Sequence, residues 1–291
     1  MEDNSASQTS RGWMVFMVLI ITWTPILNPL SSYSAGVWTN EPAGANVVLD
    51  CTFSSTPSAC GILDVYSSAA VDQDSTAPAS APGVMRSTIY SGNNAGGVQI
   101  GIGFPQTYRE MFMGLMWRTN PEFYGRIVHD KMFFLRGPQT NAYFGMRACP
   151  GCTSRQLGWG FNAANADNSH TCADSGLWCY PNVGSPAITI GQWTKIEVYL
   201  KSSTTMTSRD GIVRWWINGV LAGNYTNVNH APYGLNDWTW SETWDGYVNP
   251  APSANWSHYI DHLHVSIPGG TSTDSPPGPP APPTLRNVTV P

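Results

Sequence analysis

The sequence predicts an all-β protein, an antiparallel β-sandwich of the jelly-roll type. Three observations lead to this fold class. Short runs of alternating apolar and polar residues recur along the chain, clusters of Gly, Pro, Asn and Asp separate them, and no stretch has a sustained helical period with capping residues. Many short strands with turn signals between them are typical of sandwiches and jelly rolls.

The alternating runs are interpreted as strands. The clearest is 194–201, where apolar Ile196, Val198 and Leu200 alternate with polar residues, the period of two expected for a strand with one buried face. In chain order the runs are 46–53, 83–90, 98–104, 111–118, 131–136, 142–148, 157–162, 194–201, 212–217, 220–225, 235–240 and 258–267. The segment 70–82, rich in Ala, Ser, Pro and Asp, is expected to be a loop.

A tight hairpin is expected at Asn218-Gly219, between the apolar runs 212–217 and 220–225. Both residues tolerate a positive φ angle, and such a pair between two apolar runs is the strongest short-range hairpin signal. The hairpin and the strand before it indicate an antiparallel sheet rich in aromatic residues.

The composition favours an extracellular protein. Charged residues make up 11% of the chain and the formal net charge is −5, so Ser, Thr and Asn supply most of the surface polarity. This balance argues against a helical bundle. Nucleic-acid binding requires a basic stripe, so no nucleic-acid partner is expected.

Both ends of the chain are expected to lie outside the folded domain, which is assigned to residues 35–268. Residues 1–34 contain the apolar run 13–21, which is short for a transmembrane helix, and small residues precede Ala35. These features favour a secretory signal peptide. An uncleaved anchor is the alternative, and only then would a membrane be a partner. Residues 269–291 are predicted to be a Pro-rich disordered tail, and the protein is expected to be secreted or on the cell surface.

Six cysteines in an exported chain favour three disulfides. We expect local pairing, Cys51 with Cys60, Cys149 with Cys152 and Cys172 with Cys179. The alternative is a zinc site built from the last four thiolates, whose spacing suits a structural metal centre.

Two motifs carry a family resemblance. They are W-x-x-I-E-x-Y-x-K at 193–201 and D-G-x-V-R-x-W-x-N-G at 210–219. They resemble the concanavalin A-like lectin/glucanase jelly roll, and within it secreted bacterial proteins similar to polysaccharide lyases. The segments 109–123, 131–136 and 259–266 are similar to the family's central, following and closing strands. The Glu-x-Asp-x-x-Glu strand of the glucanases is absent, so the resemblance implies the fold and, by analogy, a lyase.

If the protein is a lyase, five residues are expected to line the active groove. β-Elimination of a uronate needs a cation to neutralise the carboxylate and a base to remove the C5 proton. We expect Lys201 or Arg214 to neutralise the carboxylate and Tyr199 to act as the base. Arg118 and His129 complete the set. The alternative is a solvated sheet face with cross-strand ion pairs.

A second set of residues is expected to bind the substrate. A Trp on the concave face would stack on a sugar ring. Trp216 is expected to be the core residue by its place in the second motif, which leaves Trp215 for the substrate. Trp238 and Trp240 share one face of their strand and form either a sugar platform or an aromatic core. The complete set is Glu197, Trp215, Trp238, Trp240 and Arg136, the last of which could hold a carboxylate together with Arg118.

No metal ligand is assigned. His258, His262 and His264 are expected on one strand face, where a transition metal is one interpretation and a hydrogen-bonded structural role the preferred one. Ca²⁺ is the one cofactor kept open, because the fold often binds it, although no Asp-rich loop specifies it.

The predicted function is recognition or cleavage of an extracellular polysaccharide, with a lyase of acidic glycans favoured. One alternative is a non-catalytic carbohydrate-binding module. Another is a structural or adhesive coat or fibre subunit, which would self-assemble through sheet edges or the tail.

Overall fold

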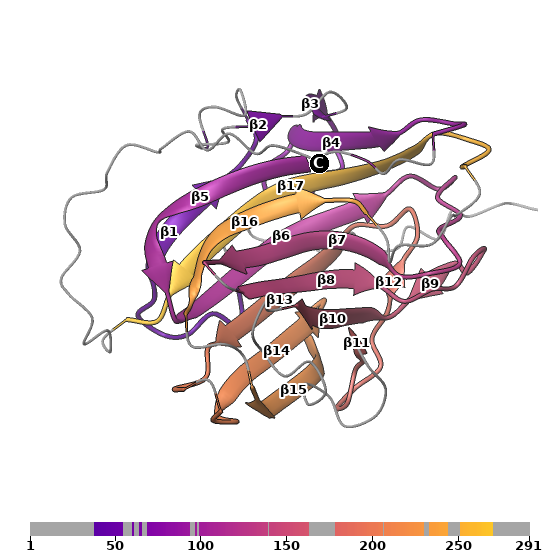
Figure 1. Ribbon diagram of the computed structural model, residues 1–291. Coiled ribbons are helices and arrows are strands. Elements are labelled where there is room, and N and C mark those ends of the chain that lie inside the picture. Colours follow the sequence, from indigo (N-terminus) through magenta and orange to yellow (C-terminus); the bar gives the residue numbers. More distant parts are fainter. Residues whose placement is uncertain are drawn as a thin grey trace, which may run out of the picture. The chain divides into compact units, whose positions relative to one another are not determined.

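The protein is an antiparallel β-sandwich made of two large sheets (Figure 1), which confirms the predicted fold class. The computed structural model describes residues 38–54, 60, 64–65, 69–93, 97, 99–138, 140–162, 178–205, 207–229, 233–243 and 251–269. All regular elements within these ranges are strands. The expected leader at 1–34 lies outside them, as do residues 270–291 of the expected tail, and both stay predictions.

The larger sheet, sheet A, has eight strands. Their order is β15 (Val220–Val228), β14 (Gly211–Ile217), β13 (Thr194–Lys201), β6 (Glu110–Thr119), β17 (Trp256–Ile267), β4 (Gly83–Ile89) and β3 (Ala69–Gln73), and β1 (Asn46–Cys51) also pairs with β17. Its centre is formed by β13, β6 and β17, which are far apart in the sequence.

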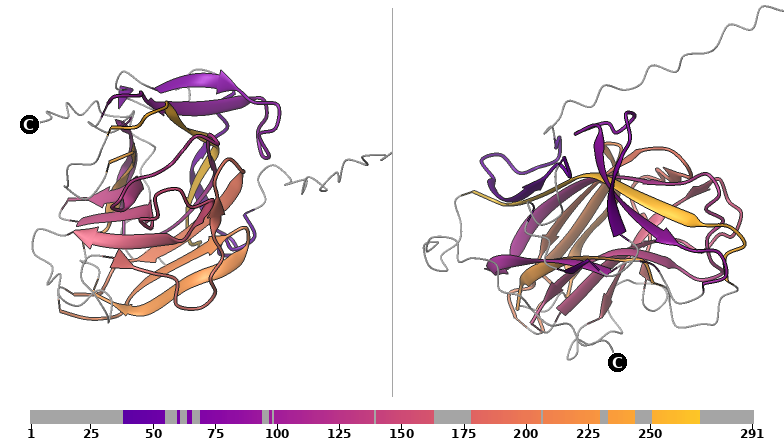
Figure 2. Two further views of the ribbon diagram at one scale, coloured as in Figure 1. Left: turned by 90° about the vertical axis from the view of Figure 1, so that its right-hand side faces the viewer. Right: turned by 90° about the horizontal axis from the view of Figure 1, so that it is seen from above.

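The smaller sheet, sheet B, has seven strands. Their order is β11 (Trp178–Cys179), β10 (Leu157–Asn162), β8 (Thr140–Met146), β7 (Asp130–Gly137), β16 (Leu235–Ser241), β5 (Gln99–Tyr108) and β2 (Asp64–Val65). A separate pair joins β9 (Ser154–Arg155) to β12 (Ile188–Thr189). Figure 2 shows the two sheets as separate layers from two further directions.

One apolar core fills the space between the sheets. Met113 and Val198 of sheet A meet Phe133 and Leu135 of sheet B in it, and all four side chains are nearly inaccessible to solvent. Because side chains alternate along each strand, every second residue enters this core and its neighbours lie on an outer face. Each sheet therefore has one outer face on which a ligand could bind.

The predicted strands are confirmed, since each of the twelve runs lies wholly or largely in a strand. The hairpin at Asn218-Gly219 is confirmed as well, with φ angles of 51° and 79° at the two turn residues. The loop expected at 70–82 is wrong in part, because β3 occupies its first residues. That strand is short and lies at the edge of sheet A, where little apolar alternation is needed.

Two of the three predicted disulfides are confirmed. Cys51 is bonded to Cys60 and Cys149 to Cys152. Cys172 lies outside the described residues, so its pairing stays a prediction. The four-thiolate zinc alternative is wrong, because thiolates that are joined in a disulfide cannot bind a metal.

Residues near the chain's described start lie across the outer face of sheet A. Trp38 is only 6% exposed, and its ring stacks on the imidazole of His264 with the ring centroids 5.7 Å apart. The Glu41 carboxylate lies 2.8 Å from Nε2 of the same histidine. We call residues 38–41 the strap, and it occupies part of the surface that a ligand on sheet A would need.

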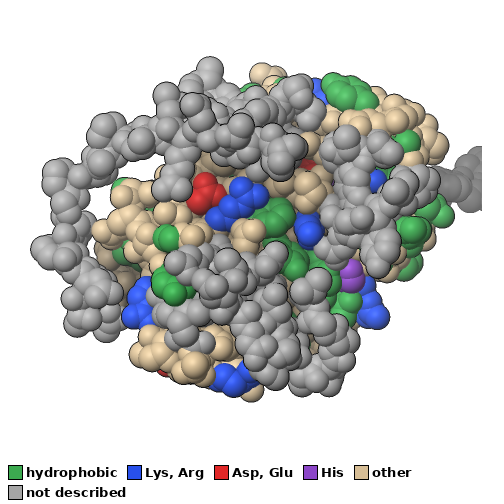
Figure 3. All heavy atoms as spheres, in the orientation of Figure 1, with side chains coloured by type: hydrophobic (Ala, Val, Ile, Leu, Met, Phe, Trp, Pro, Cys, Tyr) green, Lys and Arg blue, Asp and Glu red, His purple; other side chains and the backbone are tan. Residues whose placement is uncertain are grey.

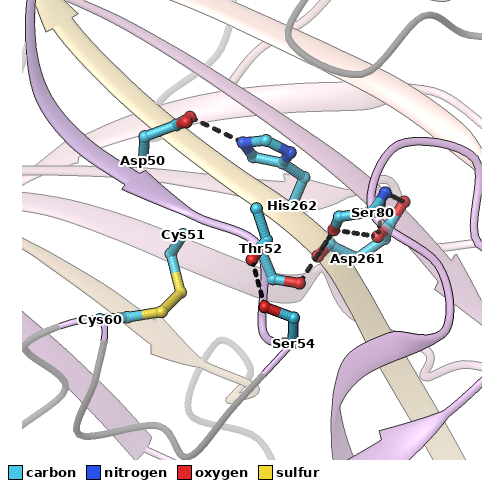
Figure 4. The surroundings of a disulfide bond; sticks show 8 residues. All are labelled: Asp50, Cys51, Thr52, Ser54, Cys60, Ser80, Asp261 and His262. Carbon is cyan, nitrogen blue, oxygen red and sulfur yellow. Dashed lines mark hydrogen bonds and ion pairs between the residues drawn. A yellow bond between two sulfur atoms is a disulfide. The ribbon is translucent and has the colours of Figure 1, made fainter.

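The loop at Ala79 and Ser80 is a second segment that packs on the outer face of sheet A. The Asp261 carboxylate on β17 is completely buried and accepts hydrogen bonds from both backbone N–H groups, and the Ser80 hydroxyl donates to it at 2.6 Å. Figure 4 shows this contact beside the Cys51–Cys60 disulfide and the hydrogen bond between Asp50 and His262.

Among the residues that the structure describes, no helix is long and apolar enough to span a membrane.

Candidate functional site

The sequence-predicted active residues lie on opposite sides of the sandwich. Tyr199, Lys201, Arg214 and Arg118 are on β13, β14 and β6 of sheet A, whereas His129 directly precedes β7 of sheet B. The apolar core separates these two outer faces. One substrate cannot contact both groups at the same time, so the five residues do not form a single site.

Tyr199 is poorly suited to act as a base. Burial raises the pKa of its hydroxyl well above the ordinary value, and the neighbouring carboxylate of Glu110 raises it further. The hydroxyl donates a hydrogen bond to Glu110. Arg214 lies over the Tyr199 ring, 5.7 Å from its centroid, and Lys201 is at 4.0 Å from Glu110. Lys201 and Glu110 are directly opposite each other on β13 and β6, so their contact is a cross-strand ion pair of the kind that the alternative interpretation expects.

Glu197 is a structural residue. It is completely buried, and its carboxylate accepts hydrogen bonds from the backbone N–H and the side-chain amide of Asn40 in the strap, at 3.1 and 2.8 Å. The Lys195 ammonium lies 3.5 Å away. The expectation that Glu197 binds substrate is therefore wrong, because the strap covers it.

Arg118 and Arg136 cannot hold one carboxylate together, because β6 and β7 belong to different sheets. Arg118 instead pairs with Asp74 at 2.7 Å, and its guanidinium lies between the rings of Trp193 and Tyr259.

The three tryptophans predicted to bind sugar lie in the core. Trp215 is 0% exposed, and Trp238 and Trp240 are 1% exposed, so none presents a ring face to a ligand. The prediction that Trp216 is the core residue of the pair is wrong. Trp215 faces inward beside Val213 and Ile217, and Trp216 is half-buried on the outer face. Trp238 and Trp240 do share one face, as expected, but that face is the inner one.

The three histidines of β17 are divided between its two faces. The pairing register shifts between Ile260 and Leu263, and this irregularity inverts the alternation of side chains. His258 therefore points into the interior, 2.5 Å from the Glu242 carboxylate, whereas His262 and His264 lie on the outer face beside Asp50. Among the residues that the structure describes, no group of three or more His, Cys, Asp or Glu side chains could hold a metal ion.

The outer face of sheet B gathers positive charge over aromatic rings. Three cations each lie over a ring, Arg136 over Phe134 at 4.9 Å, Lys131 over Tyr143 at 5.0 Å and Arg147 over Tyr180 at 4.7 Å. We call these cations together with His129 the cationic row, and Phe134, Tyr143, Trp178 and Tyr180 the aromatic floor. Lys and Arg number only 14 in a chain with a net charge of −5, so three of them on one face form a distinct positive surface.

His129 connects the row to the floor. Its ring stacks on Trp178 with centroids 4.2 Å apart and an interplanar angle of 13°. Its Nε2 lies 2.9 Å from the Tyr180 hydroxyl. An imidazole and a phenol at hydrogen-bonding distance are the kind of pair that can exchange a proton with a bound substrate.

Cross-strand register explains why these side chains meet. Phe134 on β7 is opposite Tyr143 on β8, and Lys131 is opposite Gly145. Gly145 has to be glycine because an added Cβ would lie 2.7 Å from the Trp178 ring and 2.6 Å from a backbone oxygen. The missing side chain lets Trp178 approach the sheet beside Lys131.

A buried ion pair holds the start of β7. The Asp130 carboxylate, between His129 and Lys131 in the sequence, is 2.9 Å from the Arg155 guanidinium, and both side chains are almost inaccessible. Burial raises the pKa of Asp130, and Arg155 opposes this rise. Because Asp130 points inward, its two neighbours are directed to the outer face.

Figure 3 shows the outer face of sheet B, where positive and negative side chains lie side by side near the middle, next to hydrophobic ones, and a histidine lies farther along. On this face Asp237 of β16 is directly opposite Arg136 of β7. Burial lowers the pKa of Arg136 and the Asp237 charge opposes that change. Of the residues on this face, the sequence analysis assigned His129 and Arg136 to the site. It did not identify Tyr143, Trp178, Tyr180, Arg147 and Asp237.

Several solved structures share the fold. An alginate lyase from a Chlorella virus is 12% identical and covers 76% of this chain and 100% of its own, with a TM-score of 0.54. A marine alginate lyase from Aplysia kurodai is 14% identical, covering 77% and 100%, with a TM-score of 0.54. An endo-β-1,4-glucuronan lyase from the fungus Trichoderma reesei is 11% identical, covering 71% and 91%, with a TM-score of 0.50.

No protein-family model and no curated protein sequence matches the chain. The similarity to these polysaccharide lyases therefore establishes the jelly-roll fold.

Proposed function

We propose that the protein binds an acidic polysaccharide across the outer face of sheet B and cleaves it by β-elimination. The observation that carries this proposal is the cationic row over the aromatic floor, with the His129–Tyr180 pair at one end. The solved structures with the same fold include lyases named for alginate and for glucuronan, both of which are acidic glycans.

The chemistry requires charge neutralisation and a proton transfer. A cation beside the uronate carboxylate makes the C5 proton more acidic, which is the role proposed for Lys131 and Arg147. The His129–Tyr180 pair removes that proton. The electrons left on C5 form the C4–C5 double bond, and the glycosidic oxygen leaves C4 and takes up the proton that the His129–Tyr180 pair has removed.

Secretion belongs to the same proposal. The two disulfides within the described residues suit an oxidising compartment, and a polysaccharide substrate is found outside the cytoplasm.

The test is ultraviolet absorbance of the unsaturated uronate during incubation with alginate, polyglucuronate and mixed uronate polysaccharides. Tyr180→Phe removes only the hydroxyl of the proton-transfer pair, and Lys131→Met keeps the aliphatic stem while removing the charge. We expect roughly 100-fold lower turnover for Tyr180→Phe, because a positioned acid or base contributes at least that much.

Matched controls come from the other sheet. Tyr199→Phe and Lys201→Met make the same chemical changes on sheet A, and we expect both to keep wild-type turnover. Activity lost in the sheet A variants and kept in the sheet B variants would refute the location of the site. Binding without a rise in absorbance on any polymer would refute catalysis and favour a carbohydrate-binding module.

A further inference from the structure

Charge is unevenly distributed along the outer face of sheet B. Lys131, His129 and Arg147 lie toward one end, and Asp237 faces Arg136 at the other. Lys131 and Arg136 are opposite Gly145 and Asn141 of β8, which are four residues apart, so about 13 Å separates the two ends at the rise of a strand. This distance is longer than one sugar ring, so a bound glycan would present different sugar units to the two ends.

The strand beside Asp237 carries two glycines. Asp237 is opposite Gly103 on β5, and Thr239 is opposite Gly101. A Cβ added at Gly103, which is exposed, would meet no atom within 4 Å, and one added at Gly101 would lie 3.6 Å from Asp237 Oδ2. A ring could therefore lie on these two glycines with its hydroxyls next to Asp237.

The side chains at this end suit hydroxyls better than a carboxylate. The positive charge of Arg136 is offset by Asp237, its directly opposite neighbour. A carboxylate such as Asp237 accepts hydrogen bonds from sugar hydroxyls and repels the like charge of a uronate. The other end has three positive or protonatable groups, and the described acidic residue next to them, Asp130, points inward to Arg155.

We infer that this face takes a mixed glycan, with a neutral sugar over Gly101 and Gly103 beside Asp237 and a uronate beside Lys131 and Arg147. This inference rests on the proposed function, because it assigns the substrate class of the same face. Asp237 is then the residue that discriminates against a uniformly charged polyuronate.

The experiment compares binding of two tetrasaccharides by calorimetry, one of glucuronate only and one in which glucuronate alternates with glucose. We expect the wild type to prefer the alternating tetrasaccharide. Asp237→Asn removes the charge at constant shape and should strengthen binding of the all-glucuronate ligand roughly tenfold, about 1.4 kcal/mol. The affinity of Asp237→Asn for the alternating ligand should be unchanged or lower than that of the wild type.

Two further variants complete the test. Gly103→Lys adds a cation in the open space beside Asp237 and should also favour the all-glucuronate ligand, so the conclusion does not depend on one variant folding well. Asp72→Asn removes the same charge from β3 of sheet A, where it pairs with Arg86 at 2.7 Å, and should leave both affinities unchanged.

The outcomes separate the two proposals. Equal wild-type affinity for both tetrasaccharides, with no change in Asp237→Asn, would overturn the inference and leave the proposed function standing. Absence of wild-type binding to either tetrasaccharide, and to alginate, would overturn both.

Discussion

Glu197 offers a direct test of which outer face is functional. Its buried carboxylate accepts two hydrogen bonds from Asn40 and lies 3.5 Å from the Lys195 ammonium, which is itself 4% exposed. Replacing it with Ala leaves Lys195 without this carboxylate and the strap without its two hydrogen bonds. Removing one partner of a buried pair costs about 3–5 kcal/mol.

In a domain of this size, a decrease of about 4 kcal/mol in the free energy of unfolding lowers the Tm by roughly 8–16 °C. Glu197→Gln keeps an acceptor for Asn40 and should cost about 1–2 kcal/mol. The assay is thermal unfolding followed by circular dichroism, combined with calorimetry of glycan binding well below the transition. We expect Glu197→Ala to be destabilised and, while folded, to bind glycan as tightly as the wild type.

The control is Glu122→Ala, which removes an exposed glutamate held by one hydrogen bond from Asn120 at 2.8 Å and should cost less than about 1 kcal/mol. A Glu197→Ala protein with wild-type Tm and no glycan binding would refute the reasoning, because it would show that Glu197 binds the glycan and does not stabilise the fold.

Three further predictions concern the cationic row, the core and pH. Arg147→Gln should weaken binding of a glucuronate oligosaccharide roughly tenfold at low ionic strength and less at high salt. The control Arg209→Gln changes an exposed arginine before β14 and should leave the affinity unchanged. The measurement is calorimetry of both variants at two salt concentrations. Trp215→Ala should lower the free energy of unfolding, measured in urea, by about 3–5 kcal/mol, and Trp216→Ala should lower it by about 1 kcal/mol. Equal losses would contradict the finding that Trp215 faces the core and Trp216 does not. Burial raises the pKa of Asp50, but hydrogen bonds and charge from two histidines outweigh it and hold that pKa below its ordinary value. The resulting stability is present above the unfolded pKa of about 3.9 and is lost as the pH falls through the folded value, so the stability advantage of the wild type over Asp50→Asn should disappear in acid unfolding curves.

The strands could be predicted from the sequence because alternation and turn residues are local signals. The strand Thr194–Lys201 was predicted at its observed bounds, and Asn218-Gly219 forms the expected turn. Local disulfides were predictable for the same reason, since Cys149 and Cys152 are only three residues apart.

The candidate site was harder to predict because it depends on which sheet each strand joins. Alternation shows that Glu197 and Ile196 face opposite ways, but it does not reveal that the strap covers the polar side. Lys131 and Tyr143 meet only through the pairing of β7 with β8. A one-residue irregularity, as in β17, reverses which histidines share a face, and no sequence signal marks it.

The two ends of the sandwich lie next to each other. A Cβ added at Gly269 would be 1.8 Å from the backbone oxygen of Gly44, and Asn46 pairs with Ile267 across β1 and β17. Neighbouring ends make a domain suitable for insertion into a loop of a host protein and for circular permutation. Because β1 and β17 belong to sheet A, a support attached at either end would leave the outer face of sheet B directed away from it, as a biosensor or an immobilised reagent requires.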